Sequence, residues 1–153
     1  MAISPALHVS LNAVGTIMAG AHDPWWIIGS AAVALHGADP GQVADVDALL
    51  SVANATRILP TIGIVLRTGS PDALFRSSIF GSWTGTALPV EFMADFHRWS
   101  GTEWLPVRPA TRQPFQIDGV TVFVPERAEL QAMLAAFGRP KDIERARRLA
   151  RSA

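Results

Sequence analysis

The sequence predicts an α+β fold in which helices flank a mixed β-sheet, and three observations support this prediction. Short apolar runs bounded by Gly, Pro and Asp alternate along the chain with segments of helical periodicity. The chain has 153 residues, a usual length for one domain, so we expect a single domain over residues 1–153. The composition, 49% hydrophobic and 17% charged, is typical of a globular protein and not of a disordered one.

Five segments have the composition or the apolar spacing of helices. Helix breakers fall where these segments should stop: Pro24 follows the first, Gly37 closes the second and Gly138 closes the fourth. Pro140 is acceptable in the first turn of the last helix, because an N–H at that position would have no partner within the helix. The expected helices cover residues 4–20, 31–36, 53–59, 126–137 and 140–151.

Six short apolar runs, several of them rich in β-branched or aromatic residues, are expected to be strands. Asp118-Gly119 between the last two predicts a tight hairpin. The pattern of residues 62–67 fits either a strand or the end of a helix. The expected strands cover residues 25–28, 43–51, 79–83, 88–96, 115–117 and 120–124.

Acidic residues interrupt two of the predicted strands. Asp45 and Asp47 are two residues apart, so a regular strand points both to one face, where they repel each other unless a cation lies between them. An isolated pair of this kind also fits a solvent-facing strand start. Glu91 lies in a second apolar run, where burying an acid is costly unless it is exposed, paired or bound to a metal. Asp95, which shares the face of Glu91 if that strand stays regular, and Glu103 are competitors for the third acid, and we favour Glu91 because it lies deeper in the apolar run.

Upstream of the acids, Gly29-Ser30 separates a predicted strand from a predicted helix. The free N–H groups at the start of a helix can bind a phosphate. The structural alternative is that Ser30 is simply the N-cap of the helix. The four histidines lack the paired spacing of a zinc site, so we expect them to be ordinary surface or partly buried residues.

A Gly-Ser turn before a helix, then Asp-x-Asp fifteen residues later, then a strand with a third acid, together resemble the nucleotidyltransferase superfamily. The pattern is most similar to the small bacterial members. Gly138-Arg139-Pro140-Lys141-Asp142, which opens the last predicted helix, is similar to the arginine/lysine–aspartate segment that many of these proteins carry. The resemblance covers most of residues 25–152 and implies a nucleotidyltransferase-like fold.

The resemblance also implies an activity: magnesium-dependent transfer of a nucleoside monophosphate from a nucleoside triphosphate to an acceptor, with release of pyrophosphate. The acceptor could be a small molecule, a tRNA or a protein. In that family Gly29 and Ser30 would hold the triphosphate. Asp45 and Asp47 would bind Mg²⁺, and Glu91 would complete the metal site and help to activate the acceptor hydroxyl. Oxygen ligands of this kind suit magnesium.

The predicted loop between the Gly-Ser turn and the Asp pair has no Lys or Arg, although a triphosphate needs positive partners besides magnesium. Arg76, Arg139 or Lys141 could supply them. The missing loop cations and the small size favour an alternative function, a catalytically weak nucleotidyltransferase-like module that binds a protein partner, for example as one half of a toxin–antitoxin pair.

Charge gives no argument for a membrane partner, nor for nucleic acid other than as the acceptor, because thirteen basic residues balance thirteen acidic ones. Residues 139–153 carry a net charge of +4, which we interpret as a solvated helix face because Asp142 and Glu144 lie among the basic residues. No apolar run approaches the ~20 residues of a membrane span. Without cysteines or a basic N-terminal region typical of a signal peptide, the chain is expected to be cytoplasmic.

Overall fold

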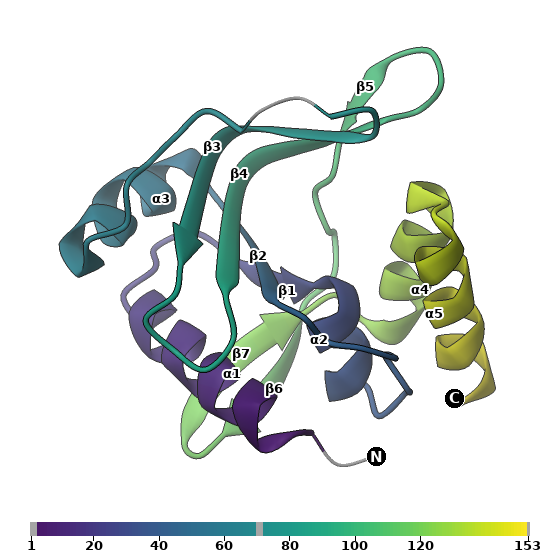
Figure 1. Cartoon of the computed structure of the whole chain (residues 1–153), viewed down its shortest axis with the longest axis horizontal. Helices are drawn as coiled ribbons and strands as arrows, with labels where there is room; N and C mark the ends of the chain where they lie inside the picture. The colour runs from purple at the N-terminus through teal and green to yellow at the C-terminus, as the bar shows by residue number, and fades with distance from the viewer. Residues whose placement is uncertain (1–2, 70–71, 153) are drawn as a thin grey trace.

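The computed structural model of the protein describes residues 3–69 and 72–152, and Figure 1 shows how their helices surround the strands. The helices are α1 (Pro5–Met18), α2 (Gly29–Leu35), α3 (Val52–Ile58), the 3-10 helix η1 (Leu59–Ile62), α4 (Arg127–Phe137) and α5 (Pro140–Arg151). The strands are β1 (Trp26–Ile28), β2 (Val46–Leu50), β3 (Phe75–Trp83), β4 (Val90–Trp99), β5 (Trp104–Pro106), β6 (Gln113–Ile117) and β7 (Val120–Val124). The predicted fold class, a mixed sheet with flanking helices, is confirmed.

The larger sheet has the strand order β1-β2-β4-β3, and β5 pairs with β4. Strands β2 and β4 run parallel, whereas β1, β3 and β5 are antiparallel to the strands they pair with. Two parallel neighbours need a long connection, and α3, η1 and β3 lie within it. The parallel register sets Asp47 directly opposite Glu91.

The β6–β7 hairpin forms a second, two-stranded sheet. Its turn residues Asp118 and Gly119 both have positive φ, 50° and 79°, as a tight hairpin turn requires. The predicted hairpin is therefore confirmed. Helix α1 lies across this hairpin (Figure 1), and the Asn12 side-chain amide donates a 2.8 Å hydrogen bond to the carbonyl of Ile117.

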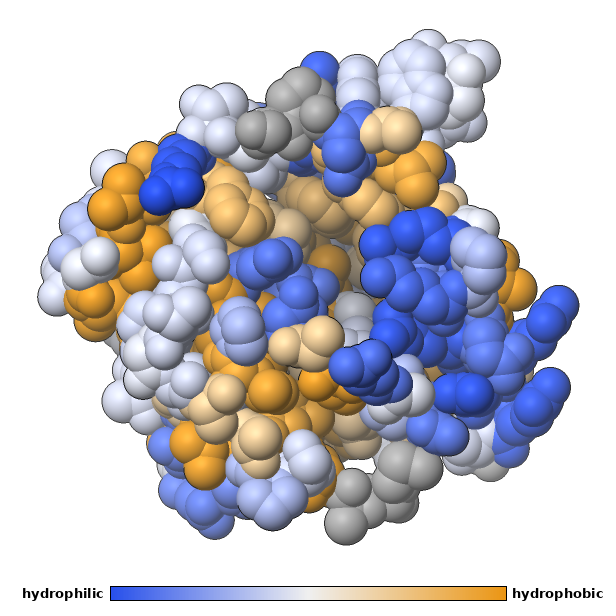
Figure 2. Space-filling model, in the orientation of Figure 1, coloured by the Kyte–Doolittle hydropathy of each residue, from blue (hydrophilic) through white to orange (hydrophobic). Residues whose placement is uncertain are grey.

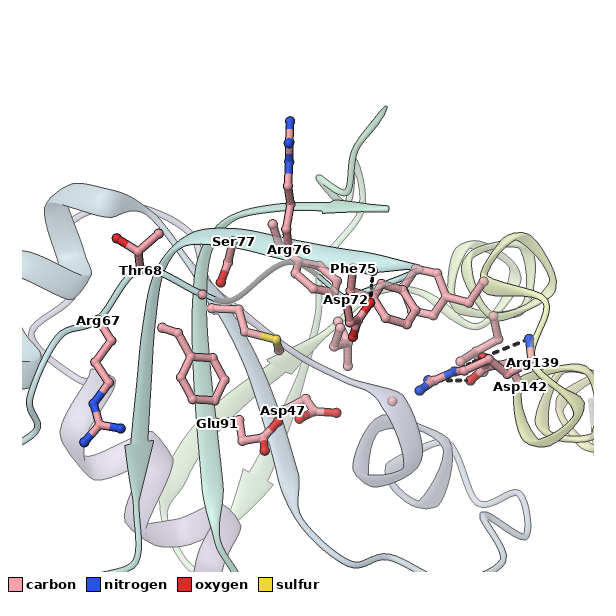
Figure 3. Close-up of a pocket in the computed structure, with 18 residues that line it drawn as sticks. Asp47, Arg67, Thr68, Asp72, Phe75, Arg76, Ser77, Glu91, Arg139 and Asp142 are labelled. Carbon is pink, nitrogen blue, oxygen red and sulfur yellow. Dashed lines mark hydrogen bonds and ion pairs between the residues drawn. The ribbon is translucent and has the colours of Figure 1, made fainter. Parts of the chain in front are cut away.

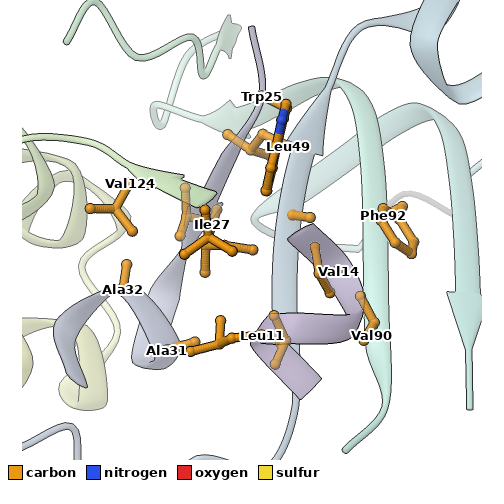
Figure 4. Close-up of a cluster of buried hydrophobic side chains, with 14 of the residues drawn as sticks. Leu11, Val14, Trp25, Ile27, Ala31, Ala32, Leu49, Val90, Phe92 and Val124 are labelled. Atoms are coloured by element: carbon orange, nitrogen blue, oxygen red, sulfur yellow. The ribbon is translucent and has the colours of Figure 1, made fainter. Parts of the chain in front are cut away.

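The apolar core lies between α1, the β1–β2–β4 part of the larger sheet, and β7 (Figure 4). Leu11 and Val14 of α1, Ile27 of β1 and Phe92 of β4 are completely buried, and so is Val124 of β7. Burial of such side chains contributes about 1.5–3 kcal/mol each. This core fixes β2 and β4, the two strands that carry the acidic residues. Within the described chain, no helix is both long and apolar enough to cross a membrane.

Local differences from the sequence-based expectations concern element ends. The strand expected over residues 43–51 begins only at Val46, so Asp45 is the last residue of the preceding loop and not a strand residue. Helix α2 begins at Gly29, directly after β1, so Gly29-Ser30 forms the first turn of the helix and not a separate turn. Residues 62–67 are the end of η1 and an extended segment in which Arg67 pairs with Phe80. The three-residue strand β5 was not expected.

Gly15 of α1 packs directly against β7. A Cβ atom at this position would contact the side chain of Val120 and lie 3.1 Å from both the Thr121 carbonyl oxygen and a methyl group of Val122. We expect Gly15→Val to lower the free energy of unfolding by about 1–3 kcal/mol, because the larger side chain forces the helix away from the hairpin. Thermal melting measures the loss. Gly20→Val is the matched control, since nothing lies within 4 Å of a Cβ atom at Gly20, and an equal loss in both variants would contradict this packing.

Candidate active site

Three carboxylates meet at one edge of the larger sheet. Asp45 ends the loop before β2, Asp47 lies within β2, and Glu91 lies in β4. Each side chain offers a carboxylate oxygen that lies within 4.8 Å of the oxygens offered by the other two. All three residues are half-buried. The structure thus brings together the three acids that the sequence singled out, and their oxygens could hold a divalent metal ion.

The electrostatics of this cluster favour a bound proton or cation. Burial, together with repulsion from Asp45 and Glu91, raises the pKa of Asp47 to about 8. Burial and the charge of Asp45 also raise the pKa of Glu91. The Arg139 guanidinium offsets only part of the effect on Asp47. Three carboxylates this close are not all ionised without a counter-charge, so a cation that displaces the protons would relieve the repulsion.

Gly29 places the backbone of α2 against the cluster. Its φ is +67°, a conformation that favours glycine, and a Cβ atom there would lie only 3.1 Å from a carboxylate oxygen of Asp47. The residue before the helix, Ile28, offers no side-chain cap, and Ser30 is buried in the first turn. The Ser30 side chain therefore does not act as the N-cap considered from the sequence.

A cavity of about 540 Å³ opens in front of the acids, and we call it the polar cavity. Its walls come from the start of α2, the loop before β2, Glu91 of β4, and α5. Figure 2 shows hydrophilic side chains gathered over α4 and α5. The basic residues that line the polar cavity all lie at or in α5: Arg139, Lys141, Arg145 and Arg148.

Helix α5 supplies the cations that the loop before β2 lacks. The Arg145 guanidinium donates hydrogen bonds to the carbonyls of Pro40 (2.9 Å) and Gln42 (3.2 Å), and Arg148 donates to the Asp39 carbonyl (3.3 Å). Sequence reasoning missed Arg145 and Arg148 as residues of the site. Arg145 follows Lys141 by four residues and Arg148 follows Arg145 by three, a spacing that would have placed all three on one helix face.

Arg139 is held beside the acids by Asp142, which is completely buried. The guanidinium donates two hydrogen bonds to this carboxylate, of 2.6 and 3.0 Å, and lies 4.9 Å from the ring centroid of Phe75. Arg139 and Lys141, which the sequence offered as positive partners for a triphosphate, both line the polar cavity. Arg76, the other cation considered, does not line the polar cavity; its guanidinium lies 4.6 Å from the ring centroid of Trp104.

The two competing acids lie outside the cluster. Asp95 has a positive φ of 54°, so β4 does not stay regular as far as this residue. Its exposed carboxylate accepts a hydrogen bond from the Ser78 hydroxyl. Glu103 is exposed in the turn between β4 and β5. Among residues 3–69 and 72–152, only Asp45, Asp47 and Glu91 form a group able to hold a metal ion, and no histidine belongs to one.

No protein-family profile matches the chain, and no curated protein sequence matches it. Solved structures do match. A candidate nucleotidyltransferase from Thermotoga maritima is 21% identical, with a TM-score of 0.67 over 94% of this chain and 92% of its own. The chain has a nucleotidyltransferase-like fold. This agrees with the resemblance seen in the sequence.

Two further nucleotidyltransferase-like structures share this fold. The antibiotic-resistance factor ANT(2'')-Ia is 14% identical, with a TM-score of 0.58 over 94% of this chain and 83% of its own. An antigenic nucleotidyltransferase-like protein from Paracoccidioides brasiliensis is 16% identical, with a TM-score of 0.59 over 97% of this chain and 76% of its own. At these identities the likeness shows the fold alone, so the chemistry must be argued from the site.

The raised pKa of Asp47 predicts a pH dependence of stability for the metal-free protein. Below pH 8 the folded protein keeps a proton on Asp47 that the unfolded chain releases near pH 4, so this contribution to stability is lost as the pH rises through about 8. We expect the melting temperature in EDTA to fall between pH 5 and pH 8.5. The fall should be smaller for Asp47→Asn, which cannot titrate. The same fall in both proteins would show that Asp47 does not titrate in this way.

Proposed function

We propose that the protein is a magnesium-dependent nucleotidyltransferase that moves a nucleoside monophosphate from a nucleoside triphosphate to an acceptor hydroxyl. One observation carries the proposal: the cluster of Asp45, Asp47 and Glu91 faces a cavity whose opposite wall is basic. Acids alone would suit many cations. Acids beside several cationic side chains suit a metal-bound polyphosphate, because neither the metal ion nor the cationic side chains alone can balance the negative charge of the phosphates.

The cluster fits magnesium by its donor set and by its charge. Its donors are carboxylate oxygens, and the raised pKa values of Asp47 and Glu91 reflect negative charge that lacks a partner. We assign Asp45, Asp47 and Glu91 as the residues that would hold magnesium. When bound, the metal would neutralise charge on the phosphate oxygens and on the leaving group.

In the proposed reaction an acceptor hydroxyl oxygen attacks the α-phosphorus of the triphosphate. The bond from this phosphorus to the oxygen that bridges the α- and β-phosphates breaks, and pyrophosphate leaves. The hydroxyl proton passes to a carboxylate, for which we assign Glu91. Gly29 and Ser30 would hold the triphosphate in the polar cavity, with Arg139 and Lys141 as its positive partners.

The proposal leaves the acceptor open. One solved structure is of ANT(2'')-Ia in complex with adenylyl-2''-tobramycin, an adenylylated compound. Its nucleotidyl chemistry supports the proposal, but at 14% identity its acceptor is not transferred to this chain. The alternative function, a catalytically weak binding module, was motivated by a loop without cations. The cations that α5 brings to this loop support the proposal of an enzyme.

Magnesium binding by the cluster predicts a difference between two Asp→Asn variants. We expect millimolar magnesium with ATP, GTP, CTP or UTP to raise the melting temperature of the wild type, by an amount equivalent to about 2.7 kcal/mol at a hundredfold excess over Kd. Asp47→Asn should fold but lose most of this shift. Asp95→Asn, an exposed acid of the same sheet outside the cluster, should keep it. No shift in the wild type with any of the four nucleotides, or an equal shift in Asp47→Asn, would overturn the proposed function.

Lys141 offers a separate test of the triphosphate position. It is exposed at the polar cavity, and no ion pair of Lys141 is found within residues 3–69 and 72–152. We expect Lys141→Ala to weaken triphosphate binding about tenfold, because a charge-assisted contact is lost. Calorimetry with a non-hydrolysable ATP analogue and magnesium measures this. Arg147→Ala is the control, since Arg147 is exposed on the same helix but does not line the cavity; equal losses would indicate only a general effect of charge.

A further inference from the structure

A second cavity, of about 480 Å³, has Asp47 and Glu91 among its lining residues (Figure 3). Gly29, Asp47, Glu91 and Arg139 line both cavities. The acids therefore lie at a junction between the polar cavity, which is basic, and this second cavity. A volume of this size is within the range of small-molecule sites.

Apart from the shared junction, half of the residues that line the second cavity are apolar, four of them phenylalanines, and we call it the apolar cavity. Met93 and Phe96 of β4, with Leu134 and Phe137 of α4, are buried side chains that line it. Phe80 of β3 also lines the cavity and is only half-buried. An apolar wall exposed in a cavity favours an occupant with an apolar surface, because both lose contact with water on binding.

The acids in the apolar cavity, other than the proposed metal ligands, are already engaged. The buried Asp142 carboxylate binds Arg139 in two hydrogen bonds. Asp72 accepts hydrogen bonds from the backbone N–H groups of Leu74 (2.7 Å) and Phe75 (2.6 Å). Asp72 is exposed at the edge of the cavity, so an ammonium group in its buried part would meet apolar carbon, a hydroxyl or a guanidinium and no free carboxylate other than the proposed metal ligands, which penalises a cation there.

Arginine side chains do not make the apolar cavity a site for a strongly anionic occupant either. Arg139, which is paired with Asp142 and lies over the Phe75 ring, also lines the polar cavity, where it is assigned to the triphosphate. Arg67 is exposed to solvent and lies at the other end of the cavity from Arg139 in Figure 3. Arg76 points away from the cavity in Figure 3 and stacks on Trp104. The chemistry of the walls therefore favours a neutral body.

The geometry of phosphoryl transfer decides what the occupant is. An in-line displacement needs the attacking oxygen and the leaving oxygen on opposite sides of the phosphorus. The basic residues place the leaving pyrophosphate in the polar cavity, so the attacking hydroxyl comes from the other side of the acidic junction. We propose that the apolar cavity binds the acceptor, and that the acceptor is a small hydroxyl compound with a neutral, largely apolar body. This inference rests on the proposed function, because it needs the triphosphate in the polar cavity.

The test compares two hydroxyl-bearing probes of similar size, the neutral 2-naphthalenemethanol and the cationic amino sugar glucosamine. Each is titrated into the full chain with magnesium and a non-hydrolysable ATP analogue, and binding is followed by ligand-observed NMR. We expect naphthalenemethanol to bind at least tenfold more tightly than glucosamine. Equal binding, or tighter binding of glucosamine, would overturn the proposed acceptor class.

Two phenylalanine variants locate the binding site. Phe80→Ser should weaken naphthalenemethanol binding about tenfold, because about 50 Å² of apolar contact is lost. The same variant should bind the ATP analogue with the affinity of the wild type. The control is Phe115→Ser, which alters a half-buried ring of β6 outside both cavities and should change neither affinity. Melting curves establish that both variants are folded at the titration temperature, and Phe80→Leu replaces Phe80→Ser if that variant is not.

The outcomes separate the two proposals. If Phe80→Ser weakens the ATP analogue and not the alcohol, the apolar cavity holds the nucleobase, and the acceptor assignment is wrong while nucleotidyl transfer stands. If Phe80→Ser changes neither affinity, the alcohol binds elsewhere and the assignment is equally wrong. If the wild type binds the alcohol but no triphosphate, nucleotidyl transfer itself fails, and the apolar cavity is a ligand site without an acceptor role.

Discussion

The parallel pairing of β2 with β4 is the constraint on which the site depends. It sets Asp47 directly opposite Glu91, and the loop end brings Asp45 to the same edge. Like charges at this spacing repel, so the pairing must be held by something other than the acids. The neighbouring residues of the two strands do this, because Val46 and Val90 are completely buried in the apolar core. The core therefore opposes the repulsion between the acids, and part of the stability of the core is used in holding them together.

Helix α5 balances this charge from the other end of the sequence. At its start, Arg139 pairs with the buried Asp142 and places a guanidinium near Asp47. Further along the helix, Arg145 and Arg148 bind carbonyl oxygens of the loop that leads to Asp45. The same helix thus supplies positive charge to the polar cavity and restrains the backbone of one of the three acids.

Much of the site could be predicted because it follows from short-range pattern. The two-residue spacing of Asp45 and Asp47, and a single acid in the apolar run around Glu91, were visible in the sequence and coincide in space. Glu91 was favoured over Asp95 because it lies deeper in the apolar run, and the left-handed backbone at Asp95 interrupts the regular strand that would have put both acids on one face. The position of Arg145 was not predicted, because its contacts join residues more than one hundred positions apart. The apolar cavity was also out of reach, since it exists only where α4 packs beside β3 and β4.

The division of charge along the chain has a consequence for how the site is made during synthesis. The acids belong to residues 45–91, whereas every basic residue lining the polar cavity belongs to residues 139–148. A ribosome delivers the carboxylates first, and the sheet that holds them is complete before α5 leaves the exit tunnel. The nascent domain therefore passes through a stage in which the acids are present without the basic residues of the polar cavity. Docking of the final helix ends that stage, so a chain truncated before α5 would keep the acids but have no basic wall to hold a triphosphate.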